Sequence, residues 1–186
     1  MNQENVETRK FLTPKDTWGH VFAGPGEWKP APWLRFLSPP ATFHFRTEAT
    51  WLDGENFFFM HDTTTWPNGH KEFRDAVAKR TAPDRVRVTY DGMQAGMEIK
   101  LRADGFTSTY RYQTALAPRL SARTVYADVI DDNYVGTAGE ATRRGLKGFA
   151  DLDPSTPVMH DTLTMRWRGR PLGELILRLT PEDAEA

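Results

Sequence analysis

The sequence predicts a mainly β protein whose short antiparallel strands close into a barrel. Three observations support this fold class. Apolar and polar residues alternate from Phe43 onward, which is typical of half-buried strands. Asp-Gly pairs separate several of the segments, as in tight hairpins. About nine such segments follow one another at spacings near ten residues, which favours a barrel over parallel βαβ units. The alternative is an α+β fold with a curved sheet wrapped on a helix.

The length of 186 residues favours one domain over the whole chain, 1–186. Within this domain the sequence predicts four kinds of segment: an irregular strap (1–42), the barrel (43–132 and 158–179), a helical or loop insertion (133–157) and a tail (180–186). The strap is rich in proline, which disfavours a long helix or a central strand. It also holds large apolar residues such as Trp28 and Trp33, so we expect it to be ordered and packed over the barrel.

The expected strands follow the alternation of apolar residues. In the first, Phe43, Phe45, Thr47, Ala49 and Trp51 share one face. The next is expected over 57–66, and another lies around Phe73 and Val77. The remaining strands are predicted over 86–90, 97–101, 106–114, 122–129, 158–167 and 172–179. The only helix is expected within 138–149, and its glycines limit it to a turn or two.

Composition and motifs exclude several classes of function. Lys and Arg number 24 against 25 Asp and Glu, without a run of like charges, so neither nucleic acid nor an anionic membrane is expected as a partner. Because cysteine is absent, disulfides and thiolate sites are excluded. No stretch approaches the length of a membrane-spanning helix, so we expect a soluble, cytoplasmic protein. Nucleotide-binding loops and metal-ligand spacings are also missing, so we expect no cofactor and no metal.

One tetrapeptide occurs twice: Met60-His61-Asp62-Thr63 and Met159-His160-Asp161-Thr162. The simpler interpretation is that two strands share an environment or pair with each other. The functional interpretation uses strand parity, because alternate residues face opposite sides of a sheet. In the later copy Asp161 shares the apolar face and His160 points away, whereas both faces of the earlier copy look buried.

If Asp62 and Asp161 face one apolar interior, desolvation and repulsion would raise at least one pKa and supply a proton donor near neutral pH. Tyr110 is the third candidate for acid–base chemistry. A more ordinary role for each Asp is to accept hydrogen bonds at a strand end. Aromatic residues make up 12% of the chain, which fits either an ordinary core or the wall of a small-molecule site. The candidate ligand-binding residues are Phe58, Met60, Trp66, Phe106, Ser108, Tyr112, Tyr126, Asp128, Met165 and Trp167.

The Gly26-x-Trp28 pattern followed by a meander of short strands resembles the lipocalin, or calycin, group of β-barrels. That resemblance implies a Trp across the barrel floor, an interior that binds small apolar molecules and, in some members, cofactor-free isomerisation or cyclisation. The segment from His160 to Leu172 also resembles the last hairpin of uncharacterised bacterial barrel proteins, which implies nothing about a substrate.

Three functions follow as hypotheses. The first is binding of a small hydrophobic or aromatic molecule inside the barrel. The second is a cofactor-independent cyclase, isomerase or dehydratase acting on such a compound. The third is a protein-interaction module that uses Trp28 and Trp33 on an outer strap, which a filled interior would favour. A homodimer remains open.

Overall fold

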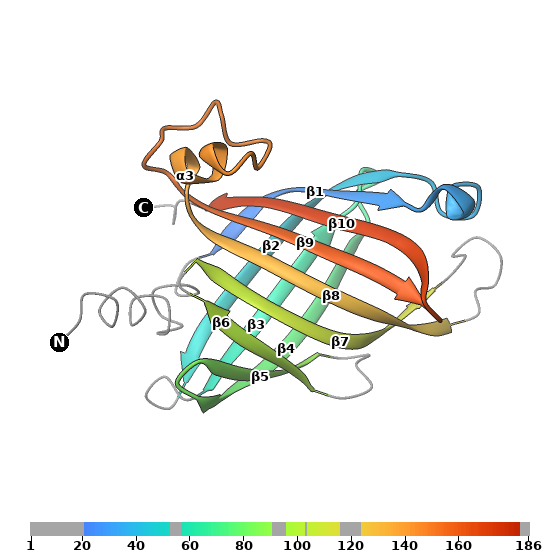
Figure 1. Ribbon diagram of the computed structural model, residues 1–186, viewed down its shortest axis with the longest axis horizontal. Helices are drawn as coiled ribbons and strands as arrows, with labels where there is room; N and C mark the ends of the chain where they lie inside the picture. Colours follow the sequence, from blue (N-terminus) through green and yellow to red (C-terminus); the bar gives the residue numbers. More distant parts are fainter. Residues whose placement is uncertain (1–20, 53–56, 91–95, 103, 116–123, 183–186) are drawn as a thin grey trace.

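The computed structural model describes residues 21–52, 57–90, 96–102, 104–115 and 124–182, and there the chain forms a closed antiparallel barrel (Figure 1). Its strands are β1 (Phe22–Pro30), β2 (Ala41–Leu52), β3 (Phe57–Thr65), β4 (Lys71–Ala82), β5 (Arg85–Tyr90), β6 (Met97–Arg102), β7 (Gly105–Ala115), β8 (Thr124–Thr137), β9 (Pro157–Trp167) and β10 (Arg170–Pro181). Consecutive strands pair with each other, and β1 pairs with β10 to close the barrel. The predicted meander barrel is confirmed, and the alternative of a curved sheet wrapped on a helix is wrong.

The first departure from the prediction is β1, which lies inside the segment expected to be an irregular strap. β1 pairs with β2 from Phe22 to Trp28 without a break, but its pairing with β10 has no partners at Gly24 and Pro25. Proline has no N–H to donate, and this gap in the ladder accommodates it. A side chain at Gly24 would lie 2.2 Å from the carbonyl oxygen of Arg178, so glycine allows the two strands to approach.

Residues 1–20 of the predicted strap lie outside the described residues, and the part that follows β1, residues 31–40, lies at one end of the barrel. A short 3-10 helix, η1 (Pro32–Leu34), follows β1 at one end of the barrel, and Phe36 nearby is 95% exposed. Phe59 on β3 and Phe73 on β4 are also exposed on the outer surface. The outer face of β3 is therefore open, and the impression from sequence that both of its faces are buried is wrong.

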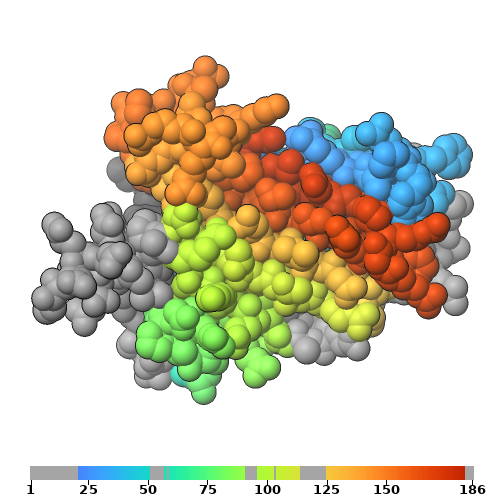
Figure 2. All heavy atoms as spheres, viewed as in Figure 1, coloured from blue at the N-terminus to red at the C-terminus, as the bar shows by residue number. Residues whose placement is uncertain are grey.

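The helix α3 (Ala138–Arg143) is as short as expected. The Thr137 side chain accepts a hydrogen bond from the Glu140 backbone, and the Glu140 side chain caps the Thr137 backbone in return. Gly145, with φ of +77°, follows the helix C-terminus. The helix and the loop after it pack on the outer face of β8 and β9 and protrude from the end of the barrel (Figure 2). In the part of the chain that the structure describes, no helix is long and apolar enough to cross a membrane.

Apolar clusters fill parts of the barrel interior. One is built from β3 to β7 and includes Val88 and Ile99, and a second joins β1 and β2 to β8, β9 and β10 around Leu177. A third lies near η1, where Leu34 packs with Val129. Residues from all three clusters also line an internal space, so the barrel is filled only in part.

Candidate functional site

The candidate site is a cavity of about 480 Å³ inside the barrel. It lies within the range of about 300–1,000 Å³ that is typical of small-molecule sites. Arg74 on β4 and Gln113 on β7 line the cavity and are exposed, so it reaches solvent at the barrel end that carries the β3–β4 turn. Both lie near the ends of their strands at that side of the molecule.

Most of the cavity wall is apolar or aromatic. The aromatic members are Phe22, Trp28, Phe43, Phe45, Trp66, Tyr90, Phe106, Tyr110 and Tyr112, and leucine and methionine side chains fill the spaces between them. Strand alternation explains this wall, because inward positions of β2 and β7 carry these rings while polar residues face out. The wall can therefore bury a flat apolar molecule.

One polar wall is formed by Asp131 and Asn133 on β8 and Asp161 on β9. Asn133 lies directly opposite Asp161 in the β8–β9 ladder, and Asp131 is two residues away on the same face. The Asp131 and Asp161 carboxyl groups are hydrogen-bonded to each other. One oxygen of each, and both amide atoms of Asn133, have no hydrogen-bond partner among the described residues. Asn133 is 1% exposed, so its amide group is buried, and buried polar groups ordinarily have hydrogen-bond partners.

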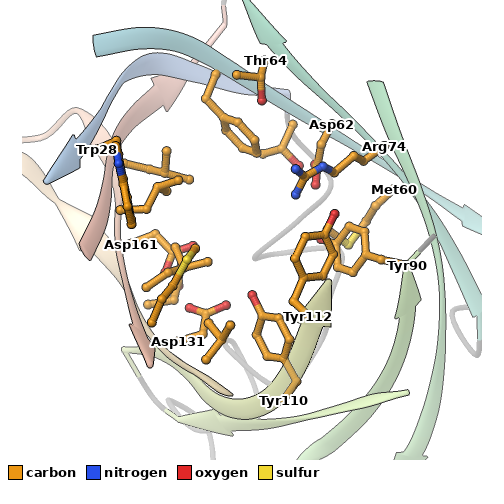
Figure 3. Close-up of a pocket in the computed structure, with 18 of the residues that line it drawn as sticks. Trp28, Met60, Asp62, Thr64, Arg74, Tyr90, Tyr110, Tyr112, Asp131 and Asp161 are labelled. Carbon is orange, nitrogen blue, oxygen red and sulfur yellow. The ribbon is translucent and has the colours of Figure 1, made fainter. Parts of the chain in front are cut away.

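Asp62 on β3 belongs to the opposite wall (Figure 3). Its carboxyl group is hydrogen-bonded to the side chains of Thr47 and Tyr90. Arg74 is its cross-strand neighbour on β4, and the Arg74 guanidinium lies over the Tyr112 ring at 4.8 Å from the ring centroid. This wall therefore has its own cation, although Oδ1 of Asp62 has no hydrogen-bond partner in the described part of the chain.

Burial raises the pKa of Asp62, Asp131 and Asp161. Burial raises the pKa of Asp62 from 3.8 to about 6, against the opposing effect of the Thr47 and Tyr90 hydrogen bonds. Burial also raises the pKa of Asp131 to about 6, although the hydrogen bond from Asp161 opposes this rise. Burial and the neighbouring Asp131 carboxylate together raise the pKa of Asp161 well above its usual range. The shared hydrogen bond lowers the pKa of Asp131 and raises that of Asp161, the pattern of a bond in which Asp161 is the donor and Asp131 the acceptor.

The two Met-His-Asp-Thr segments lie on β3 and β9, which are not neighbours in the barrel. They therefore do not pair with each other, and that part of the simpler interpretation is wrong. Asp62 and Asp161 both line the one cavity, as the functional interpretation required. The histidines face outward: His61 Nδ1 lies 2.7 Å from Asp75 Oδ1, and the His160 ring packs against Phe149.

Most of the nominated site residues line the cavity: Asp62, Asp161, Tyr110, Met60, Trp66, Phe106, Tyr112 and Met165. Ser108 is buried but does not line it, and the Ser108 hydroxyl donates to Met97 Sδ at 3.1 Å. Trp167 packs near Leu172, away from the cavity, with the Arg168 guanidinium over its ring. The side chain of Phe58 lies outside the described residues.

Tyr126 and Asp128 were assigned to the wrong face of β8. Both point to solvent, and Asp128 forms an ion pair with Arg111 at 3.0 Å. The aromatic ring of Tyr126 suggested an interior face, but the small residue Ala127 points inward instead, where the cluster near η1 leaves little room. The inward positions of β8 are the odd-numbered ones.

Four functional candidates were missed by sequence reasoning: Arg74, Tyr90, Asp131 and Asn133. The alternation of inward and outward residues along a strand could have identified three of them. Tyr90 continues the inward face of Val86 and Val88, and Asp131 and Asn133 continue that of Val125 to Val129. The predicted strand ended at residue 129, so Asp131 and Asn133 fell outside it. Arg74 carries no such signal, because a charged residue near a strand end is ordinarily exposed.

Trp28, in the Gly26-x-Trp28 pattern, lines the cavity beside η1 rather than the outer surface. Its indole N–H donates to Ser38 Oγ at 2.9 Å. Trp28 therefore contributes to the interior, and the expectation that it forms an outer interaction surface is wrong.

No group of three or more His, Asp or Glu side chains in the described ranges is arranged to hold a metal ion. The chain matches no family model, and comparisons with curated proteins and with solved structures also find no match.

Proposed function

We propose that the protein binds a small hydrophobic or aromatic molecule inside its barrel. The observation that carries this proposal is the cavity of about 480 Å³ with its aromatic wall. Burial of apolar surface supplies the driving force for binding in such a site, and a few polar groups fix the orientation of the ligand. We further propose a cytoplasmic location and no nucleic-acid or membrane partner, on the balanced charge and lack of cysteine in the sequence.

A cavity-filling substitution tests the proposal, with naphthylethanol as the probe. Ala49 lines the cavity, and its neighbour Thr50 faces solvent on the same strand. We expect saturable binding of naphthylethanol by calorimetry, a loss of roughly tenfold or more in affinity in Ala49→Phe, and unchanged affinity in Thr50→Phe. Equal affinities in the two variants, or no binding by the unmodified protein, would contradict an interior site.

A cofactor-independent acid–base enzyme is a second candidate, of the cyclase, isomerase or dehydratase type. One observation favours it: Asp131 and Asp161 form a hydrogen-bonded carboxyl pair inside the cavity, with Tyr110 close enough for its pKa to be raised by both. In such a pair one group can give a proton while the other takes one.

Nitrobenzisoxazole is a suitable reporter of this chemistry. A base removes its C–H proton, the N–O bond breaks, and the released electron pair gives a coloured cyanophenolate. We expect the protein to accelerate this ring opening and the variant with both Asp131→Asn and Asp161→Asn to lose the acceleration. Equal rates in the protein and in the double variant count against the enzyme.

A further inference from the structure

The carboxyl groups on the cavity wall outnumber the cations. Asp62, Glu72, Asp131 and Asp161 line the cavity, and Arg74 is the one Lys or Arg among the described lining residues. Arg74 lies with Asp62 on the wall opposite Asp131 and Asp161 (Figure 3). Among the described residues, no cation contributes to the electrostatics of Asp131 or Asp161. Their wall therefore has a negative character that these residues do not neutralise.

Three acceptor atoms on the same wall have no donor in the part of the chain that the structure describes. They are Oδ1 of Asp131, Oδ1 of Asn133 and Oδ1 of Asp161. Asp131 is 5% exposed and Asn133 is 1% exposed, so these atoms are buried in the wall of the cavity. A buried polar atom without a partner costs about 1–3 kcal/mol, and three of them on adjacent strands is a costly arrangement unless something binds there. A ligand with several N–H donors would satisfy them together.

We propose that the ligand carries a protonated amine on an aromatic body, and that the wall of Asp131, Asn133 and Asp161 binds this amine. The inference rests on the proposed function and specifies its ligand. An ammonium group has three donors and no acceptor, which matches three unpartnered acceptors in number and sign. Hydrogen bonds from a cation to carboxylates are also stronger than neutral ones. The aromatic wall supplies rings whose faces attract a cation as well.

Other ligand classes fit this wall less well. A carboxylate or phosphate would be repelled by Asp131. A neutral carbonyl could accept a hydrogen bond from the Asn133 amide nitrogen but would leave the acceptors of Asp131, Asn133 and Asp161 without donors. An ammonium group can donate to all three acceptors and leaves only the Asn133 amide nitrogen without a partner.

Binding of an amine at this wall depends on pH in a defined direction. The carboxyl pair of Asp131 and Asp161 interacts electrostatically with Asp132, with Tyr110 and, from the opposite wall, with Asp62. The cavity is also lined by Arg74, Glu72 and Tyr90. None of the acidic neighbours stabilises a second negative charge on the Asp131–Asp161 pair, so the pair retains protons when the cavity is empty. A bound ammonium group favours the loss of these protons. A primary alkyl amine stays protonated to a pH of about 10. Affinity for the amine is therefore higher at pH 8 than at pH 5.

The test compares naphthylethylamine with naphthylethanol on the full chain by calorimetry. At pH 8 we expect the amine to bind at least about tenfold more tightly than the alcohol. At pH 5 we expect the two compounds to bind with nearly equal affinity. Asp131→Asn removes the preference at pH 8. Asp128→Asn, a change on the solvent face of the same strand, retains it. Titrations in two buffers with different ionisation enthalpies should show proton release on amine binding, and this measurement needs no variant.

The outcomes separate this inference from the proposed function. If naphthylethanol binds and Ala49→Phe prevents it, while the amine binds no more tightly at pH 8, the amine inference is overturned and interior binding stands. A preference that survives in the variant with both Asp131→Asn and Asp161→Asn also overturns it. If neither compound binds, both proposals fall. Should Asp131→Asn not fold, the pH dependence and proton release of the unmodified protein decide.

Discussion

Two aspartates on β8, three positions apart, have opposite environments. Asp128 faces solvent and pairs with Arg111, whereas Asp131 faces the cavity beside Asp161 with no cation near it. An exposed ion pair such as the first contributes at most about 1 kcal/mol. A buried carboxylate without a cation destabilises the empty protein instead. The contrast is consistent with the role in ligand binding that we propose for Asp131.

This placement predicts how stability depends on pH. Folding raises the pKa of Asp131 from 3.8 to about 6. Between these values the folded protein binds more protons than the unfolded chain, so the contribution of Asp131 to the free energy of unfolding falls as pH rises. Asp131→Asn removes that contribution. We therefore expect the variant to be more stable than the unmodified protein at pH 8, by about 1–3 kcal/mol, and similar to it near pH 4.

Urea unfolding at the two pH values, followed by circular dichroism, measures this difference. Asp128→Asn is the matched control, and we expect it to leave the pH dependence from 4 to 8 nearly unchanged because its carboxyl group is exposed. A variant Asp131→Asn that is less stable than the unmodified protein at pH 8 would show that the carboxylate is well compensated in the empty barrel.

The alternation of apolar and polar residues predicted strands within β2 to β10 because each of these strands has one face toward the interior. It failed at β1, where Gly24 and Pro25 interrupt the ladder and no regular alternation marks the buried face. Closure depends on pairings between residues far apart in sequence, such as Trp28 with Leu175, and no local pattern contains that information. The prolines in this segment argued against a strand, although the barrel closes only through β1.

The site was predictable only where parity was clear. Asp161 was placed correctly because Leu163, Met165 and the residues beyond it define one face of β9. Asp131 and Asn133 were missed because Asp131-Asp132 looks like a turn, although β8 continues to Thr137. Polar residues inside a barrel weaken the alternation that predicts a strand, so the functional part of β8 was the part least visible in the sequence.

Across the whole molecule, the cavity follows from the closure of ten strands. An interior of about eight strands is just wide enough to be filled by side chains or to hold one small ligand, and the diameter grows with the number of strands. Here apolar clusters fill part of the space and leave about 480 Å³ between them. Carboxyl groups from β3, β8 and β9, which lie far apart in sequence, meet around this space only because the barrel closes (Figure 3).

The location of a bound ligand tests the central claim most directly. A crystal structure of the protein with naphthylethylamine should show the naphthyl ring inside the barrel among the aromatic side chains. Its nitrogen should lie about 2.7–3.2 Å from a carboxylate oxygen of Asp131 or Asp161. Density for the compound only on the outer surface, for instance beside Phe59 and Phe73, with an interior that holds none of it, would contradict the account.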